Sequence, residues 1–164
     1  MLKILVERWD RNKPLLVETL KEIENIDDIE YKDLVKITFS TIFNGQKPDV
    51  NSFCRDYKDL DVNSITEINN GSYSGTLVYL IPFDSYSPSP DEYLMTYVYY
   101  GSCSGCDTLQ GIKYDSDSDG DKEKQVSELV SLCKDIITNT IKPYNHGWRH
   151  ADEFDHVEVE VEDE

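Results

Sequence analysis

The chain contains 164 residues, and its 33 Asp and Glu against 16 Lys and Arg give a formal net charge of −17. Proteins that bind DNA, RNA or anionic membranes directly use basic surfaces, so this charge argues against all three as direct ligands. We expect a basic protein as the partner instead. A chain of this length buries one core, which predicts a single domain over residues 1–150 and an acidic tail over 151–164.

The sequence also predicts where the protein acts. No apolar run is long enough to span a membrane, and residues 1–8 meet charge too early for the core of a signal peptide. These features predict a soluble protein of the cytoplasm. The four cysteines are expected to be thiols or metal thiolates, because a domain of this size with a hydrophobic core does not need disulfides.

The first third of the chain has the apolar periodicity of helices. Apolar residues recur at spacings of three and four over 15–23, and Pro14 suits the first turn of that helix. Residues 1–9 fit either a helix or a strand. After a break at 27–28, residues 34–43 predict a second helix, with a strand as the alternative because the stretch is rich in β-branched and aromatic residues.

The middle of the chain predicts a β-meander. Residues 65–68, 75–83 and 92–100 have the composition of strands, and the Asn-Asn-Gly-Ser stretch at 69–72 is typical of a turn. The third of these strands is apolar or aromatic on both faces. It is therefore expected to be central in the sheet or covered by helices on one face.

The last third predicts helices again. Residues 101–111 form a turn that leads into a short helix, and 114–121 form an acidic loop. The clearest helix covers 122–142, where the apolar stripe includes Cys133 as a core residue and Pro143 ends the helix. The whole pattern predicts an α+β fold, in which a three-stranded antiparallel meander packs against two or three helices.

Two pairs of potential metal ligands stand out. Cys103 and Cys106 form a C-x2-C pair directly after a strand, and His146 and His150 form an H-x3-H pair. Together they would make a tetrahedral zinc site if the intervening helix returns the chain. Two other interpretations stay open for the cysteine pair: a thiol-disulfide site at a helix start, or small residues packed in a tight turn.

Residues 115–121 begin like a calcium-binding loop. Asp115, Asp117 and Asp119 occupy its first, third and fifth positions, and a glycine follows at the sixth. The pattern fails at the twelfth position, where Val126 stands in place of a bidentate glutamate. An acidic linker that caps the following helix is the better interpretation.

No motif points to an enzyme. The chain has no nucleophile elbow, no phosphate-binding loop and no dinucleotide-binding glycine pattern. Its three histidines all lie within the last twenty residues. We therefore expect a non-enzymatic protein without catalytic residues, and no cofactor unless zinc is bound.

One segment carries a family resemblance. Residues 75–82, GTLVYLIP, and 99–110, YYGSCSGCDTLQ, lie within a stretch from 64 to 112 that resembles a block of small uncharacterised acidic proteins encoded by bacteriophages, especially those of low-GC Gram-positive hosts. The resemblance implies a phage or prophage protein that acts in the host cytoplasm. It implies no particular reaction.

Phages carry small acidic proteins that match the phosphate backbone in charge and occupy the nucleic-acid groove of a host restriction, CRISPR or transcription protein. The resemblance therefore implies a DNA-mimic inhibitor that binds a basic host protein and blocks its nucleic-acid-binding surface. The alternatives are a small structural zinc-binding domain and a phage structural or assembly component. The candidate partner-binding residues are acidic: Asp115, Asp117, Asp119, Asp121, Asp152, Glu153, Asp155, Glu158 and Glu160.

Overall fold

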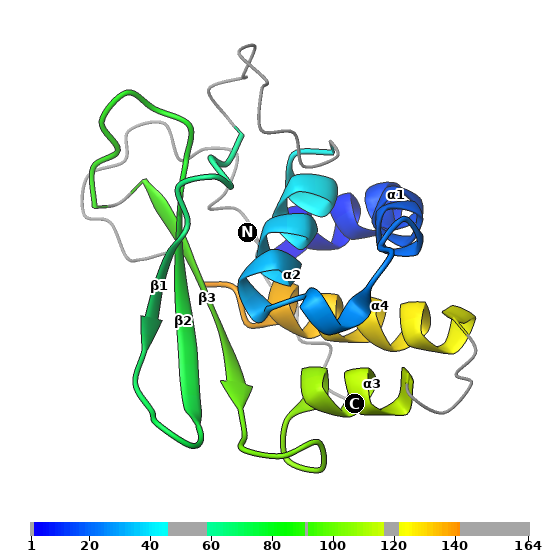
Figure 1. Cartoon of the computed structure of the whole chain (residues 1–164). Helices are drawn as coiled ribbons and strands as arrows, with labels where there is room; N and C mark the ends of the chain where they lie inside the picture. The colour runs from blue at the N-terminus through cyan, green and yellow to red at the C-terminus, as the bar shows by residue number, and fades with distance from the viewer. Residues whose placement is uncertain (1, 46–58, 91, 117–121, 142–164) are drawn as a thin grey trace, which may run out of the picture.

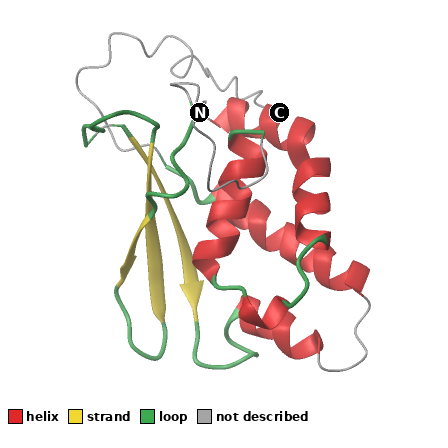
Figure 2. Cartoon of the chain, turned by 45° about the horizontal axis from the view of Figure 1, so that its top comes forward, coloured by secondary structure: helices red, strands yellow, loops and turns green. Residues whose placement is uncertain are grey.

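The computed structural model describes residues 2–45, 59–90, 92–116 and 122–141 of the chain. The described residues form two layers, a three-stranded sheet and a group of helices that covers one of its faces (Figure 1, Figure 2). The predicted α+β fold is confirmed. The acidic tail predicted for residues 151–164 lies outside the described residues.

Helix α1 (Leu2–Lys21) is continuous from the ambiguous first segment into the helix predicted over 15–23. Residues 2–9 are therefore helical and do not form a strand. Pro14 lies inside this helix, and its expected position in the first turn was wrong. Proline removes one backbone hydrogen bond from a helix interior. At most 1% of Leu16 and of Leu20, on the same helix, is exposed. The burial of this apolar face keeps the helix intact across the proline.

Helix α2 (Tyr31–Thr38) follows a short 3-10 turn (Ile26–Asp28) and continues into a π-helical turn, η2 (Phe39–Phe43). The predicted helix is thus confirmed over the alternative strand. Glu30 and Asp33 form a capping box in which each side chain accepts a hydrogen bond from the other's backbone N–H. This box fixes the start of α2 immediately after the 3-10 turn.

The sheet is a meander of β1 (Thr66–Asn69), β2 (Gly75–Pro82) and β3 (Tyr93–Tyr100), with the antiparallel order β1-β2-β3. The central strand is therefore β2. Of the two expectations for the third strand, a central position was wrong, and helices do cover one face. Tyr79 of β2 pairs with Thr96 of β3, and both side chains are fully buried on the face toward the helices.

Helix α4 (Lys122–Thr138) packs behind β3 and ends earlier than expected. The Thr96 hydroxyl donates to the Ile136 carbonyl at 2.7 Å, and the Asn139 side chain donates to the Tyr97 carbonyl at 3.1 Å. These bonds lie where the chain leaves α4. Beyond the helix, the backbones of Ile141 and Met95 form an antiparallel bridge. The predicted core position of Cys133 is confirmed, because its side chain is fully buried.

Helix α3 (Thr108–Ser116) is longer than the short helix expected here. It includes the first residues of the segment that was expected to form an acidic loop over 114–121. The turn between β3 and α3 carries both cysteines of the C-x2-C pair. The fold therefore places this turn at the edge of the sheet, beside the helix layer (Figure 1).

Candidate functional site

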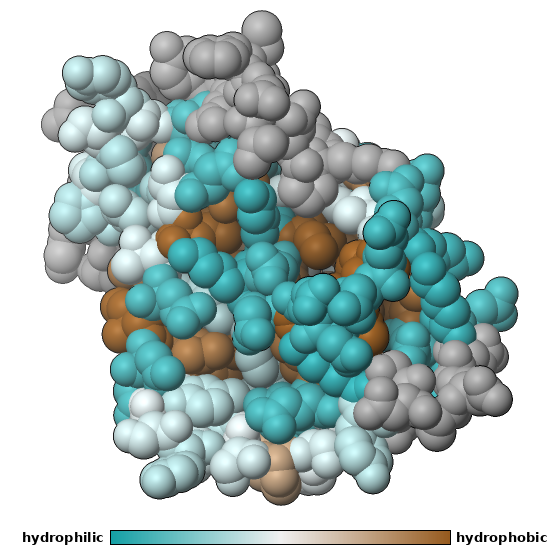
Figure 3. Space-filling view, in the orientation of Figure 1, coloured by the Kyte–Doolittle hydropathy of each residue, from teal (hydrophilic) through white to brown (hydrophobic). Residues whose placement is uncertain are grey.

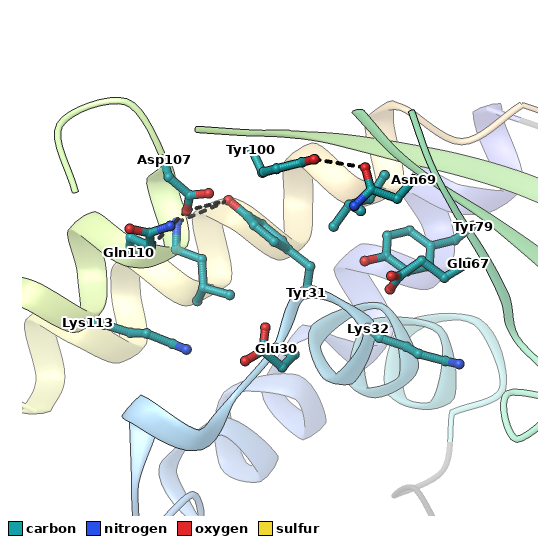
Figure 4. A pocket seen from close by; sticks show the side chains of 12 residues that line it. Glu30, Tyr31, Lys32, Glu67, Asn69, Tyr79, Tyr100, Asp107, Gln110 and Lys113 are labelled. Carbon is teal, nitrogen blue, oxygen red and sulfur yellow. Dashed lines mark hydrogen bonds between the residues drawn. The ribbon is translucent and has the colours of Figure 1, made fainter. Parts of the chain in front are cut away.

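A pocket of about 420 Å³ lies between the helix-facing side of the sheet and helices α2 and α3 (Figure 4). Its wall on the sheet side comes from all three strands, and its other wall comes from the starts of α2 and α3. The residues that matter for its chemistry are Glu30, Tyr31, Lys32, Glu67, Asn69, Tyr79, Tyr100, Asp107, Gln110 and Lys113. The pocket thus combines carboxylates, phenols and two lysines.

Tyr31 joins the two helices that border the pocket. Its hydroxyl donates to Asp107 Oδ1 at 3.0 Å and accepts a hydrogen bond from the Leu109 backbone N–H at 3.2 Å. Burial is the main cause that raises the pKa of Tyr31 above its ordinary value, and the negative charge of Asp107 adds to it. Tyr31 is therefore a neutral donor that positions the start of α3.

Asp107 organises the turn before α3. Its Oδ1 also accepts from the Gln110 N–H at 2.8 Å, which is an N-terminal helix cap, and its Oδ2 accepts from the Gly101 N–H at 3.1 Å. Only 4% of Asp107 is exposed. The sequence interpretation missed this residue. An aspartate three positions before a glutamine at the start of a helix is the signal that would have indicated it.

Tyr79 is a further buried polar side chain in the wall of the pocket. Its side chain is fully buried, and among the described residues its hydroxyl has no hydrogen-bond partner. The hydroxyl lies beside the exposed carboxylate of Glu67 (Figure 4). Burial, together with the charge of Glu67, raises the pKa of Tyr79 above its ordinary value. Tyr79 is therefore a neutral side chain whose hydroxyl is buried in the pocket wall beside Glu67.

The charges around the pocket are unevenly distributed. Residues 59–112 contain no Lys or Arg. They include all three strands and the turn between β3 and α3 that carries Cys103 and Cys106, here named the cysteine turn. The two lysines of the pocket, Lys32 and Lys113, belong to the helix side, where Lys113 Nζ donates to the Asp27 carbonyl at 2.8 Å. The sheet side of the pocket is thus uniformly free of basic side chains.

In sequence, the cysteine turn lies between Tyr100 and Asp107, two residues that line the pocket. The Cys103 N–H donates to Cys106 Sγ at 3.0 Å, and the Cys106 thiol is 3.2 Å from the Cys103 carbonyl oxygen. Both cysteines are exposed free thiols. Hydrogen bonds from Cys103, first from its side chain, hold the pKa of the Cys106 thiol below its ordinary value. The Cys106 thiol therefore loses its proton more readily than an ordinary cysteine thiol.

The structure describes two of the four predicted zinc ligands. It brings Cys103 and Cys106 together in one turn, whereas His146 and His150 lie outside the described residues. Within the described ranges, no group of three or more His, Cys, Asp or Glu side chains is arranged to hold a metal ion. The zinc site as a whole stays a prediction.

Most of the predicted partner-binding carboxylates also fall outside the described residues. Asp115 lies in the last turn of α3. The others are not described, and they are Asp117, Asp119, Asp121, Asp152, Glu153, Asp155, Glu158 and Glu160.

Among the helices that the structure describes, none has both the length and the apolar character to cross a membrane.

Comparisons with known proteins found no matching family model, no similar curated protein and no similar solved structure.

Proposed function

We propose that this chain is a non-enzymatic, acidic protein that binds a basic partner protein and covers the nucleic-acid-binding surface of that partner. The observation that carries the proposal is the net charge of −17 together with the complete lack of Lys and Arg in residues 59–112. The partner we propose is a host defence or nucleic-acid enzyme, in line with the bacteriophage resemblance of residues 64–112.

The distribution of charge supports an oriented encounter. Helix α1 carries several cations, among them Arg8, Arg11 and Lys13, whereas the sheet carries none. A basic surface is attracted to the side of the molecule that lacks positive charge, and this steering speeds association at low ionic strength. The sheet side is therefore the side that we propose faces the partner.

The pocket between the sheet and helices α2 and α3 supplies a specific contact. Glu30 and Glu67 border it, and so do Lys32 and Lys113. Phenol rings of Tyr31, Tyr79 and Tyr100 line it. Guanidinium and ammonium groups bind to carboxylates through charge-assisted hydrogen bonds and to aromatic faces through cation–π interactions. We propose that an arginine or lysine side chain of the partner enters here.

The face of the molecule that Figure 3 shows is compatible with a polar interface. On this face, hydrophobic residues reach the surface in patches that are bordered by hydrophilic residues (Figure 3). Interfaces of transient complexes have this mixed character, with charged groups that set specificity and association rate.

The test is affinity capture followed by competition. The full chain is immobilised, bacterial lysate is applied at low salt, and retained proteins are eluted with a salt gradient. We expect a basic nucleic-acid-binding protein that elutes at modest salt and that loses DNA or RNA binding when this chain is added. A lysate that yields no such protein, or a captured protein that still binds nucleic acid normally, contradicts the proposal.

A pair of charge variants locates the contact. Glu67→Gln removes one carboxylate at the pocket, and Glu7→Gln removes one exposed carboxylate from α1. We expect Glu67→Gln to weaken the complex about tenfold, as for a charge-assisted hydrogen bond, and Glu7→Gln to change it little. Equal effects of the two variants would show that charge alone, without the pocket, holds the partner.

The two alternatives have their own measurements. A structural zinc-binding domain built on Cys103, Cys106, His146 and His150 requires stoichiometric zinc in purified protein and a melting temperature that falls when zinc is removed. A phage structural or assembly component requires a stable homo-oligomer in light scattering.

A further inference from the structure

The cysteine turn has the geometry of a pair that can close into a disulfide. The Cys106 N–H donates to the Cys103 carbonyl at 2.9 Å, which closes a β-turn. A β-turn holds its first and fourth α-carbons within about 7 Å, and disulfides join α-carbons roughly 4.4–6.8 Å apart. The Cys106 sulfur lies over the backbone of Cys103, 3.0 Å from its nitrogen. The two thiols thus belong to one compact turn.

The position of the Cys106 sulfur is enforced by its surroundings. Gly101 is buried beneath it, and a Cβ at that position would lie 2.6 Å from Cys106 Sγ. The absence of a side chain at Gly101 therefore makes room for the sulfur. The backbone N–H of Cys103 donates to the sulfur at 3.0 Å and holds it over the turn.

Both thiols can be reached from solvent. Cys103 and Cys106 are exposed, whereas Cys133 is fully buried. A shallow pocket of about 400 Å³ adjoins the turn and is lined by Ser104, Gln110 and Lys113 among others. A small disulfide therefore has access to the turn and space beside it.

We propose that Cys103 and Cys106 form a redox-active dithiol that exchanges with aliphatic disulfides. The Cys106 thiolate attacks one sulfur of a disulfide R–S–S–R, forms a mixed disulfide and releases one R–S⁻. The Cys103 thiol loses its proton to solvent, and its sulfur attacks Cys106 Sγ and releases the second R–S⁻. The dithiol is oxidised to the Cys103–Cys106 disulfide, and the external disulfide is reduced to two thiols. This inference is independent of the proposed partner binding.

The probe is cystamine, a small cationic disulfide that the acidic protein attracts. The full chain is reduced, incubated with cystamine, quenched by alkylation and mapped by peptide mass spectrometry. We expect one peptide that contains an internal Cys103–Cys106 disulfide, and a thiol that persists at Cys133 while the protein is folded. Cysteines 103 and 106 that are both recovered as alkylated thiols, or as mixed disulfides that never close, would overturn the proposal.

Two variants separate the roles of the sulfurs. In Cys103→Ser the mixed disulfide with cystamine is expected to accumulate on Cys106, because no second thiol is present to release it. In Cys106→Ser we expect formation of a mixed disulfide on Cys103 to be about tenfold slower, because Cys103 lacks the donor that stabilises the Cys106 sulfur. Circular dichroism confirms that each variant is folded. The same rate in both variants contradicts the assignment of Cys106 as the attacking sulfur.

Metal content provides the remaining check. Purified wild-type protein is analysed for zinc before reduction. The proposal expects no stoichiometric zinc and the same disulfide formation with or without a chelator. Bound zinc that suppresses the reaction until it is removed would assign the turn to a metal site and overturn the redox proposal.

Discussion

Gly101 is the residue at which a single methyl group is expected to disturb the cysteine turn. An added Cβ would overlap the Cys106 carbonyl oxygen and lie 2.6 Å from Cys106 Sγ. We expect Gly101→Ala to lower the free energy of unfolding by roughly 1–3 kcal/mol, as other overpacked sites do. Gly105→Ala is the matched control in the same turn, because no atom lies within 4 Å of its added Cβ. Urea unfolding measures both, and equal stability of the two variants would contradict the tight packing at Gly101.

We expect the free energy of unfolding to fall at alkaline pH, because the fold buries weakly acidic Cys and Tyr side chains. Burial raises the pKa of Cys133 to about 12 from an ordinary value of 9.0, and it also raises the pKa values of Tyr31 and Tyr79 above 10.0. Below the ordinary values both the folded and the unfolded chain hold these protons. Above them the unfolded chain releases protons that the folded chain keeps, so stability falls as pH rises toward the folded pKa values.

The expected slope can be measured directly. Each such group lowers the free energy of unfolding by about 1.4 kcal/mol per pH unit within its window. Urea unfolding between about pH 8 and about pH 11 tests this, and Cys133→Ala removes the contribution of the cysteine. A free energy of unfolding that stays constant over this range would show that these groups ionise freely in the folded protein.

At the scale of elements, the strands are expected to differ in how well their amides are protected from hydrogen exchange. All four residues of β1 are exposed and the strand pairs on one side alone, whereas β2 pairs on both sides. We expect the β1 amides to exchange with deuterium at least tenfold faster than those of β2, because edge strands open locally before the core does. Hydrogen-exchange mass spectrometry compares peptides from the two strands. Equal protection would mean that the sheet opens as one unit.

The sequence predicted elements well where the local pattern is strong. The strands are found close to their predicted ranges, because turn residues and alternating apolar residues are short-range signals. The end of α4 could not be predicted, since Asn139 leaves the helix to bond with Tyr97, forty-two positions away along the chain. The position of Pro14 depends on the packing of distant helices against α1, which no local pattern encodes.

The candidate sites show the same division. The C-x2-C spacing singled out Cys103 and Cys106 with three interpretations open, and the structure shows both as exposed thiols in one turn. The pocket was not predicted, because Tyr31 and Asp107 lie seventy-six positions apart and are joined by the fold. Tyr79 looked like any aromatic residue of a strand until its hydroxyl proved to be without a hydrogen-bond partner among the described residues.

At the scale of the whole molecule, the net charge of −17 implies self-repulsion in the compact state. Salt screens this repulsion, so we expect the free energy of unfolding to rise by about 1 kcal/mol between low salt and 0.2 M sodium chloride. The exposed pair of Lys124 and Glu128, 3.7 Å apart, is of the kind that contributes little to stability, so its screening costs little.

Thermal unfolding in sodium chloride measures this effect, and a series in an uncharged osmolyte separates screening from solvent exclusion. The same salt has the opposite effect on the proposed complex, because it screens attraction to a basic partner while it relieves repulsion within this chain. A complex that weakens with salt while the free protein becomes more stable would therefore locate the electrostatic attraction at the interface. Loss of stability with added salt would instead show that attractive pairs within the fold outweigh its self-repulsion.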